Sequence, residues 1–429
     1  MSFLRKGIIV SGGQILRVGV SMLAGILFAR FLGPKGMGQY ELFRSTATIV
    51  ATLVAMGMGA ATIYFLNNRK VPADLLVTTT AKAISVLGIV LAVVLTATFL
   101  SNRSYFGEIS PVIAAAFALG VGALMAAGVL RAVLVAEMAA RRMVVVDLAG
   151  VVLLLATGTA LALSGLLKSQ TALLALAVGN CGSLTLVIYF LRRHIRLSLP
   201  FDWRMLGNII VYGVKLAAAS FLYVLSYNLT VLLLRWLSPE GFSEVGLYTR
   251  AVAVCSLATL MPTALGPLLL AKLAGSTGPT RARQAEMACR IYVVYGLVAC
   301  AGILLLGKYV IWLLYGKAYL GAQVALLILG PAIALNPLFS VCNNLLAGDG
   351  KALLTAGILV GTVAVVASVT CLAVPHLGIR GAALGALCAN AFTAVASMAV
   401  CRRLYGLKLA NCFLPQKSDF RYVLSALKG

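Results

Sequence analysis

The chain has 429 residues, of which 62% are hydrophobic and only 11% are charged, and its mean hydropathy is +1.03. This composition excludes a water-soluble globular protein of this length. The formal net charge of +24 does not indicate nucleic-acid binding, because the basic residues lie between apolar runs and not in one block with interleaved aromatic residues.

The apolar runs predict membrane-spanning helices, since ~20 apolar residues are enough for a helix to cross ~30 Å of hydrocarbon. The short alternating segments of a membrane barrel are not found. We therefore expect an all-α polytopic membrane protein with about twelve transmembrane helices. The first six spans are expected at 7–32, 38–66, 74–100, 109–135, 143–167 and 170–191.

A basic connector at 192–204 follows the sixth span and separates two halves of the chain. The remaining spans are expected at 205–237, 243–273, 285–306, 322–346, 352–374 and 379–404, before a basic tail. The segment 308–319 is left open between an extension of the ninth span and an interfacial piece. The predicted division is an N-terminal six-helix lobe at 1–196 and a C-terminal six-helix lobe at 197–429.

A repeated turn supports this division. The sequence RFLGPKGMGQY at 30–40 recurs, altered, as RWLSPEG at 235–241, followed by GLY at 246–248. A second echo aligns residues near 161–180 with residues near 372–390. Because internal symmetry at this distance indicates a duplicated unit, the chain is interpreted as one unit written twice in the same direction.

Loop charge predicts the orientation of the spans. One set of loops carries most of the basic residues, including the connector and the tail, and the opposite set carries few. Because cytoplasmic loops are enriched in Lys and Arg, we expect both termini in the cytoplasm and the protein in the cell inner (plasma) membrane. The same basic residues are expected to attract anionic lipids.

Several cations lie within the predicted spans, where an ionisable side chain is costly and is expected to face a water-filled cavity or a partner. Arg17 lies near the middle of the first span, with Gln14 on its polar stripe; the alternative is a structural pair with a carboxylate. Lys215 lies on a polar stripe of the seventh span. Arg44 and Arg250 lie at similar depths in the second and eighth spans. Arg30 and Arg235 are expected to be interfacial anchors.

Carboxylates are fewer at these depths. Glu41 is three residues before Arg44, so the two share a helix face and are expected to pair. Glu41 and Asp147 are the candidates for ion coupling. Asn228 either lines the cavity or bonds between helices. A space lined by surplus cations is electropositive and suits an anion such as a diphosphate.

The sequence offers no sign of enzyme chemistry. The loops are short, and no nucleophile–base constellation or nucleotide motif is present. The nine cysteines contain no CxxC pair, and His194 and His376 are far apart in sequence. We therefore expect no metal, no disulfide framework and no cofactor.

The segment 29–40 resembles the first turn of Wzx-like polysaccharide flippases of the multidrug/oligosaccharidyl-lipid/polysaccharide (MOP) exporter superfamily. An apolar helix ends in Ala-Arg-Phe-Leu-Gly-Pro, and a Gly-x-Tyr follows. The segments 245–248 and 343–350 are similar to that family too. The resemblance implies two six-helix lobes related by a pseudo-two-fold axis around a central cavity. It also implies that Arg17, Arg44 and Arg250 contact a diphosphate.

The expected function is that of a flippase for polyprenyl-diphosphate-linked oligosaccharides such as O-antigen units, working by alternating access between the leaflets. The diphosphate is expected on Arg17, Arg44, Arg250 and Lys215, with proton or sodium coupling and contact with a polysaccharide polymerase complex. Two alternatives on the same fold are a peptidoglycan lipid-precursor flippase and a drug/cation antiporter. The antiporter is expected to need acidic or aromatic cavity walls. A non-transporting scaffold is a third reading.

Overall fold

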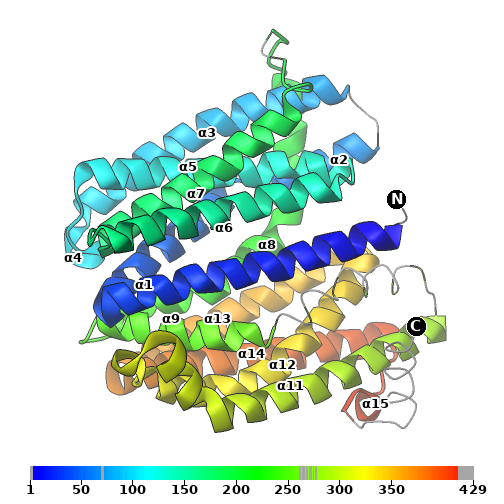
Figure 1. The fold of residues 1–429 in the computed structure, drawn as a ribbon. Helices are drawn as coiled ribbons and strands as arrows, with labels where there is room; N and C mark the ends of the chain where they lie inside the picture. The colour runs from blue at the N-terminus through cyan, green and yellow to red at the C-terminus, as the bar shows by residue number, and fades with distance from the viewer. Residues whose placement is uncertain are drawn as a thin grey trace. The chain divides into compact units, whose positions relative to one another are not determined.

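The computed structural model describes residues 3–68, 72–196, 198–259 and 278–413, together with single positions between 259 and 278. The regular elements of these residues are all helical (Figure 1). Ten of the helices are long and apolar enough to cross a membrane. The all-α, multi-span class predicted from hydropathy is therefore confirmed.

The helices follow the expected spans closely. The first half contains α1 (Phe3–Val54), α2 (Met58–Asn67), α3 (Ala73–Ser101), α4 (Arg103–Phe106), α5 (Pro111–Ala136), α6 (Ala140–Leu163) and α7 (Ser169–Leu191). The second half contains α8 (Trp203–Leu237), α9 (Phe242–Leu257), α11 (Gly278–Tyr315), the 3₁₀ turn Lys317–Tyr319, α12 (Ala322–Gly348), α13 (Ala352–Leu377), α14 (Ile379–Tyr405) and α15 (Leu409–Phe413).

The first two expected spans meet at a kink inside α1. Gly33 has φ 65° and ψ 178°, a backbone conformation that breaks the helix and is accessible to glycine without a side-chain clash. Pro34 follows and cannot donate the backbone hydrogen bond that a continuous helix needs. The repeated turn at 30–40 is thus a sharp reversal between two spans. The second span breaks again at Met56 and Gly57, both with positive φ, before α2 begins.

The segment at 308–319, which the sequence left open, is mostly an extension of the ninth span. Helix α11 continues to Tyr315, and the 3₁₀ turn at Lys317–Tyr319 follows. The eighth expected span begins in α9 and continues into residues outside those described. The basic residues expected at 69–70 and 272 and the tail after 413 also lie outside the described residues.

The chain forms two compact units, Met1–Thr249 and Arg250–Gly429. In the first unit α3, α5, α7 and α6 pack side by side, and α1 packs on α6 (Figure 1). Helix α8 belongs to this unit because it packs on α1 and α2. The two lobes predicted to divide at residue 196 stay a prediction, because contacts in one conformation do not test a relation by symmetry.

An aromatic cluster fixes the inner packing of the first unit. Phe43, Phe99, Phe106 and Phe117 meet with ring centroids 4.7–6.1 Å apart. All four side chains are buried. The cluster joins the second leg of α1 to α3, α4 and α5. It therefore holds this leg, which carries Glu41 and Arg44, against the rest of the unit.

In the second unit α12 packs on α11 and α14, and α14 packs on α13. Its largest buried cluster lies where α11, α12, α14 and α15 meet, and it contains Cys289, Cys342, Cys401 and Cys412 as free thiols. Buried thiols of this kind act as small apolar side chains.

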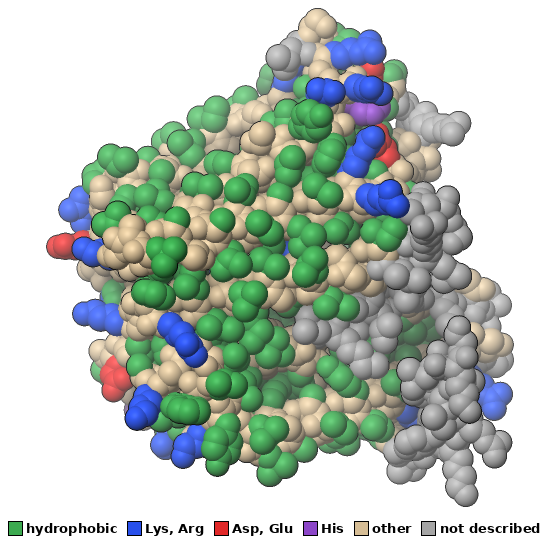
Figure 2. Space-filling view, in the orientation of Figure 1, with side chains coloured by type: hydrophobic (Ala, Val, Ile, Leu, Met, Phe, Trp, Pro, Cys, Tyr) green, Lys and Arg blue, Asp and Glu red, His purple; other side chains and the backbone are tan. Residues whose placement is uncertain are grey.

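The outer surface of the first unit matches a lipid environment. Along α3, Val86, Ile89, Val90 and Val93 are each more than half exposed. Figure 2 shows hydrophobic side chains along the middle of the visible helices and charged side chains gathered near the helix ends. This distribution is the one expected for helices that cross hydrocarbon and end in polar headgroups.

Candidate transport site

The first leg of α1 has a polar face and an apolar face on opposite sides. At 100° per residue, Gln14, Arg17 and Ser21 fall within an arc of about 60°. Leu16 and Leu23 lie on the other side, and they are 55% and 56% exposed. Arg17 and Ser21 are exposed too, and Gln14 is half-buried. Both faces of this leg are therefore left uncovered by neighbouring helices.

Arg17 has no carboxylate partner among the residues that the structure describes. It lies 14 residues after the start of α1 at Phe3, which is ~21 Å along a helix at 1.5 Å per residue. The alternative in which Arg17 is half of a structural ion pair has no support within the described chain.

The expected pair between Arg44 and Glu41 is confirmed. Arg44 Nη2 lies 2.6 Å from Glu41 Oε2, and Arg44 Nε donates to the same oxygen at 2.7 Å. The Arg44 side chain is 50% exposed, whereas that of Glu41 is 3% exposed. The buried carboxylate of Glu41 therefore neutralises part of the charge of Arg44, while the other side of the guanidinium group remains exposed. Thr48 lies one turn further along the same face.

Lys215 lies on the polar stripe of α8. Asn208, Lys215 and Tyr223 are exposed, and their spacing places them on one side of the helix. Lys215, like Arg17, has no ion-pair partner within the described residues. Tyr212, on the same stripe, stacks on Tyr64 of α2 with ring centroids 4.2 Å apart. Asn228 donates to the carbonyl of Val224 in its own helix, at 2.8 Å.

Asp147, the second candidate for ion coupling, is in an ion pair. Its Oδ2 lies 2.5 Å from Arg131 Nη2, which links α6 to α5. Both side chains are partly exposed, at 21% and 29%. A carboxylate held in this way has a structural role beside any role in coupling.

Arg250 does not share the placement of Arg44. It is only 6% exposed, and its guanidinium lies 5.7 Å from the centre of the Tyr315 ring in the second unit. The repeat explains the difference. If Gly246 corresponds to Gly38, Arg250 corresponds to Leu42, which is fully buried. An offset of two residues turns a helical side chain by about 200°.

The two copies of the repeated turn lie against each other. A Cβ added to Gly38 would lie 1.8 Å from the Phe242 carbonyl oxygen, and a Cβ on Gly246 would lie 2.0 Å from the Pro34 carbonyl oxygen. The contact is reciprocal, because each turn places a backbone carbonyl against the glycine of the other. Only glycine fits at either position, so this close approach accounts for the Gly-x-Tyr in both copies.

Arg235, which was expected to be an interfacial anchor, forms a clasp of hydrogen bonds to backbone carbonyls beside this contact. Its Nε donates to the Tyr105 carbonyl at 2.9 Å and its Nη2 to the Ser104 carbonyl at 3.0 Å. Tyr105 returns a hydrogen bond to the Leu232 carbonyl at 2.8 Å. Burial raises the pKa of Tyr105 to about 12, and the nearby Arg235 acts against that shift. The clasp joins α8 to the loop between α3 and α5.

The comparisons with known proteins settle the family. Residues 3–266 match the family model described as Polysaccharide biosynthesis protein. The chain belongs to this family. No curated protein matches it at a significant level. The family expected from the turn at 29–40 is confirmed.

Solved structures confirm the fold. An inward-facing multidrug resistance MATE family transporter of the MOP superfamily is 18% identical, with 91% of this chain and 94% of that chain covered and a TM-score of 0.78. The lipid II flippase MurJ, in an inward closed conformation, is 10% identical, with 94% and 89% covered and a TM-score of 0.75. A MOP superfamily transporter from Pyrococcus furiosus, described as having a binding pocket of reverse polarity, is 17% identical, with 95% and 96% covered and a TM-score of 0.70.

The chain is therefore a member of the polysaccharide biosynthesis protein family with a multi-pass helical membrane fold. The residues that match the family model include α1 to α9 and therefore both copies of the repeated turn.

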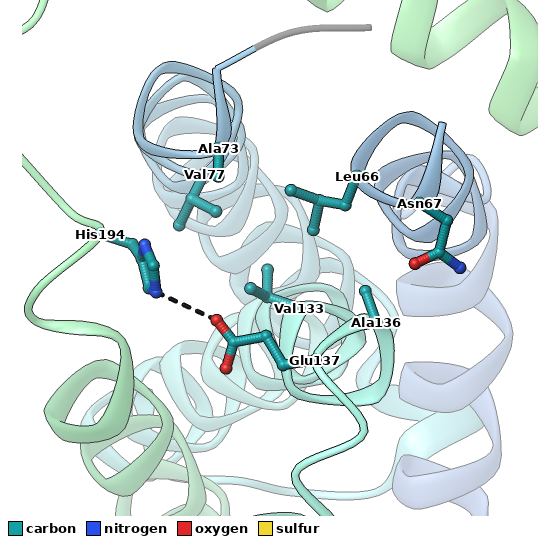
Figure 3. A pocket seen from close by; sticks show the side chains of 8 residues that line it. All are labelled: Leu66, Asn67, Ala73, Val77, Val133, Ala136, Glu137 and His194. Atoms are coloured by element: carbon teal, nitrogen blue, oxygen red, sulfur yellow. Dashed lines mark ion pairs between the residues drawn. The ribbon is translucent and has the colours of Figure 1, made fainter. Parts of the chain in front are cut away.

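One group of titratable residues was not predicted from the sequence. His194, in the connector, lies between Asp74 and Glu137, and Figure 3 shows its contact with Glu137. The two histidines were weighed only as metal ligands, and the three residues are far apart in sequence. The available signal was the position of all three at span ends on the same predicted side of the membrane.

Proposed function

We propose that this polysaccharide biosynthesis protein is a flippase that moves a polyprenyl-diphosphate-linked oligosaccharide from the inner to the outer leaflet by alternating access. The observation that carries the proposal is that two exposed cations, Arg17 on α1 and Lys215 on α8, have no carboxylate partner among the described residues. A diphosphate is the lipid-linked group whose charge complements them.

The two faces of α1 support a water-filled space beside Arg17. The apolar face with Leu16 and Leu23 suits lipid. A charged arginine facing lipid at mid-span costs about 2.5–3.5 kcal/mol or more, so the polar face belongs toward water. An arriving diphosphate then replaces water around the cation without a new burial cost.

The roles of the other predicted residues follow from their partners. Arg44 offers the open side of its guanidinium to the diphosphate while Glu41 orients it. Arg250 contributes at longer range, because the aromatic ring of Tyr315 and burial shield it. Gln14 and Asn228 offer hydrogen bonds to sugar hydroxyls. Glu41 or Asp147 couples transport to a proton or sodium gradient when its arginine moves away.

The predicted orientation places both termini in the cytoplasm, with the basic connector and tail against anionic lipids of the inner leaflet. In that orientation the reciprocal contact at Gly38 and Gly246 lies at the outer end of the spans. Contact with a polysaccharide polymerase complex belongs to the same proposal.

The test is flipping of a fluorescent polyprenyl-diphosphate sugar in reconstituted vesicles. Each charge-assisted hydrogen bond contributes about 1.5–3 kcal/mol, so Arg17→Ala with Lys215→Ala is expected to weaken half-saturation by at least about tenfold. Arg380→Ala, which removes an exposed cation at the start of α14, is the matched control. Wild-type flipping by the double variant overturns the proposal.

The same vesicles distinguish the rival functions on this fold. A drug/cation antiporter accumulates a cationic dye under a proton gradient and does not flip the sugar lipid. A peptidoglycan-precursor flippase prefers a lipid carrying a peptide. A scaffold flips neither substrate but still assembles with its partner enzymes.

A further inference from the structure

His194 is held between two carboxylates at the end of the first unit where α3 begins and α5 ends. Its Nδ1 lies 3.0 Å from Asp74 Oδ1, and its Nε2 lies 3.0 Å from Glu137 Oε1. Figure 3 shows the imidazole entering from the connector and pointing at Glu137. Arg196 Nη2 lies 3.1 Å from the other oxygen of Asp74. The three acid–base side chains are about one-third exposed, at 31–34%.

The numbers of donors and acceptors in these three side chains limit how the arrangement can be satisfied. An ionised carboxylate only accepts hydrogen bonds, and a neutral imidazole carries a single N–H. Two carboxylate oxygens, one at each ring nitrogen, both receive a hydrogen only if the ring is an imidazolium. The arrangement is therefore complete when one proton beyond the neutral ring is bound.

We propose that His194, Asp74 and Glu137 form a proton-binding site that clamps the connector onto α3 and α5. The connector joins α7 to α8, so the clamp fixes the point from which α8 starts. The proposal does not depend on which substrate the protein carries.

The backbone of the connector is held beside the same site. Thr78 donates to the His194 carbonyl at 3.2 Å and accepts from the Arg196 N–H at 3.0 Å. Lys82 donates to the Leu199 carbonyl at 2.8 Å. These bonds do not titrate near neutral pH, so the connector keeps its path when the proton leaves, and the clamp loosens without releasing it.

The two carboxylates respond differently to loss of the proton. Asp74 keeps Arg196 as a partner. Glu137 has no second donor within the described residues. It lines a cavity of about 170 Å³ together with His194, Asn67 and otherwise apolar side chains. A neutral imidazole can donate its single N–H to only one of the two carboxylates. If it donates to Asp74, the Glu137 carboxylate has no hydrogen-bond donor beside that cavity.

The other charged groups nearby act on the site only through space. Lys82 of α3 and Arg196 are directed to the connector and to Asp74. Arg142 of α6 lies over the Phe190 ring and Arg192 over the Tyr189 ring, at 5.8 Å and 4.6 Å. Arg141 and Arg193 are exposed. These cations oppose the imidazolium from a distance, whereas the two carboxylates favour it in contact.

In this proposal the clamp needs the ring proton, so its contribution to stability is present at low pH and is lost as pH rises.

The direct test is nuclear magnetic resonance of the full protein labelled with ¹⁵N-histidine. The chain has only two histidines, so His376→Gln assigns both ring signals without touching the site. At about pH 7.5, where an ordinary histidine is neutral, both ring nitrogens of His194 are expected to carry hydrogen. A neutral His194 at that pH overturns the proposal.

Thermal unfolding gives a second, independent readout. Between about pH 6 and pH 8.5 the wild-type melting temperature is expected to fall by about 2–6 °C, as judged from the usual size scaling. His376→Gln should fall in parallel, and His194→Gln should lose this slope. A His194→Gln variant that keeps the wild-type slope counts against the clamp. Neither readout involves transport, so failure here is separate from failure of the flippase proposal.

Discussion

The reciprocal glycine contact gives the sharpest prediction. Gly246→Ala places a Cβ 2.0 Å from the Pro34 carbonyl oxygen and 3.1 Å from the Gly38 nitrogen. Ordinary carbon–oxygen contacts begin near 3.2–3.4 Å, so the two backbones must separate by roughly 1.2–1.4 Å. Overpacking of this kind costs about 1–3 kcal/mol. The contact between the two copies of the repeated turn is therefore expected to open roughly 5- to 150-fold more often.

Hydrogen–deuterium exchange in nanodiscs measures that opening. Gly246→Ala should accelerate exchange at 34–40 and 242–248 together, since each turn protects the other. Gly12→Ala is the matched control, because a Cβ there meets nothing within 4 Å. Both glycines lie in helices, so the helix-propensity gain of about 1 kcal/mol is common to the two variants.

Unchanged protection in both segments of Gly246→Ala, with normal thermal unfolding, would refute the reasoning. It would mean that the backbones slide past the added methyl group without parting. If the flippase proposal holds, the same variant should favour the state that is open at this end of the spans, because only the closed state contains the contact.

Three further predictions follow from ion pairs and hydrogen bonds. Arg131→Met leaves Asp147 unpaired and should lower the free energy of unfolding by about 1–3 kcal/mol. The double variant Arg131→Met/Asp147→Leu should recover most of this loss. An equal loss in both variants would contradict a role of the ion pair in stability. Arg235→Lys loses the forked contact to two carbonyls and should speed exchange at 103–108. Arg103→Lys, at an exposed position of the same segment, should not. A hydrogen bond from Tyr405, with Arg281, holds the pKa of Asp349 below its usual 3.8, so its contribution is complete above that pH and lost as pH falls below it. Asp349→Asn should therefore be less sensitive to acid than the wild type in melting scans.

The fold was predictable because hydropathy dominates the choice of span. A lipid solvent leaves a backbone few options beyond helices, and most of the expected spans therefore match the helices within a few residues. The ninth span is the exception, since α11 extends beyond the expected 285–306 at both ends. The kink at Gly33 was predictable as a turn from the Gly-Pro pair. The break at Met56 and Gly57 was not, because it depends on a tertiary contact: a Cβ on Gly57 would lie 2.3 Å from the Gly213 carbonyl oxygen of α8.

The parts of the candidate site that lie on a single helix could be predicted from the sequence. Spacing on a single helix gave the pair of Arg44 with Glu41 and the polar face around Arg17. Spacing does not give contacts between distant segments. Asp74 and His194 lie 120 positions apart, and no local pattern connects them. The clasp of Arg235 was missed for the same reason, since its acceptors are carbonyls of a loop 130 positions away.

The two copies of the repeated turn share their glycine and tyrosine positions but not the positions of their cations. Gly38 and Gly246 meet across the repeat, and Tyr40 and Tyr248 two positions later are both buried. In this register Arg44 corresponds to Val252. The residues that recur in both copies are thus the glycine and tyrosine that close packing requires. The cations lie at positions where packing does not fix the residue type. Under the flippase proposal, the substrate is therefore expected to bind asymmetrically, with the first half supplying the exposed guanidinium groups. Moving the second-half cation onto the matching face, by Val252→Arg with Arg250→Leu, should therefore add an exposed cation without disturbing the glycine contact.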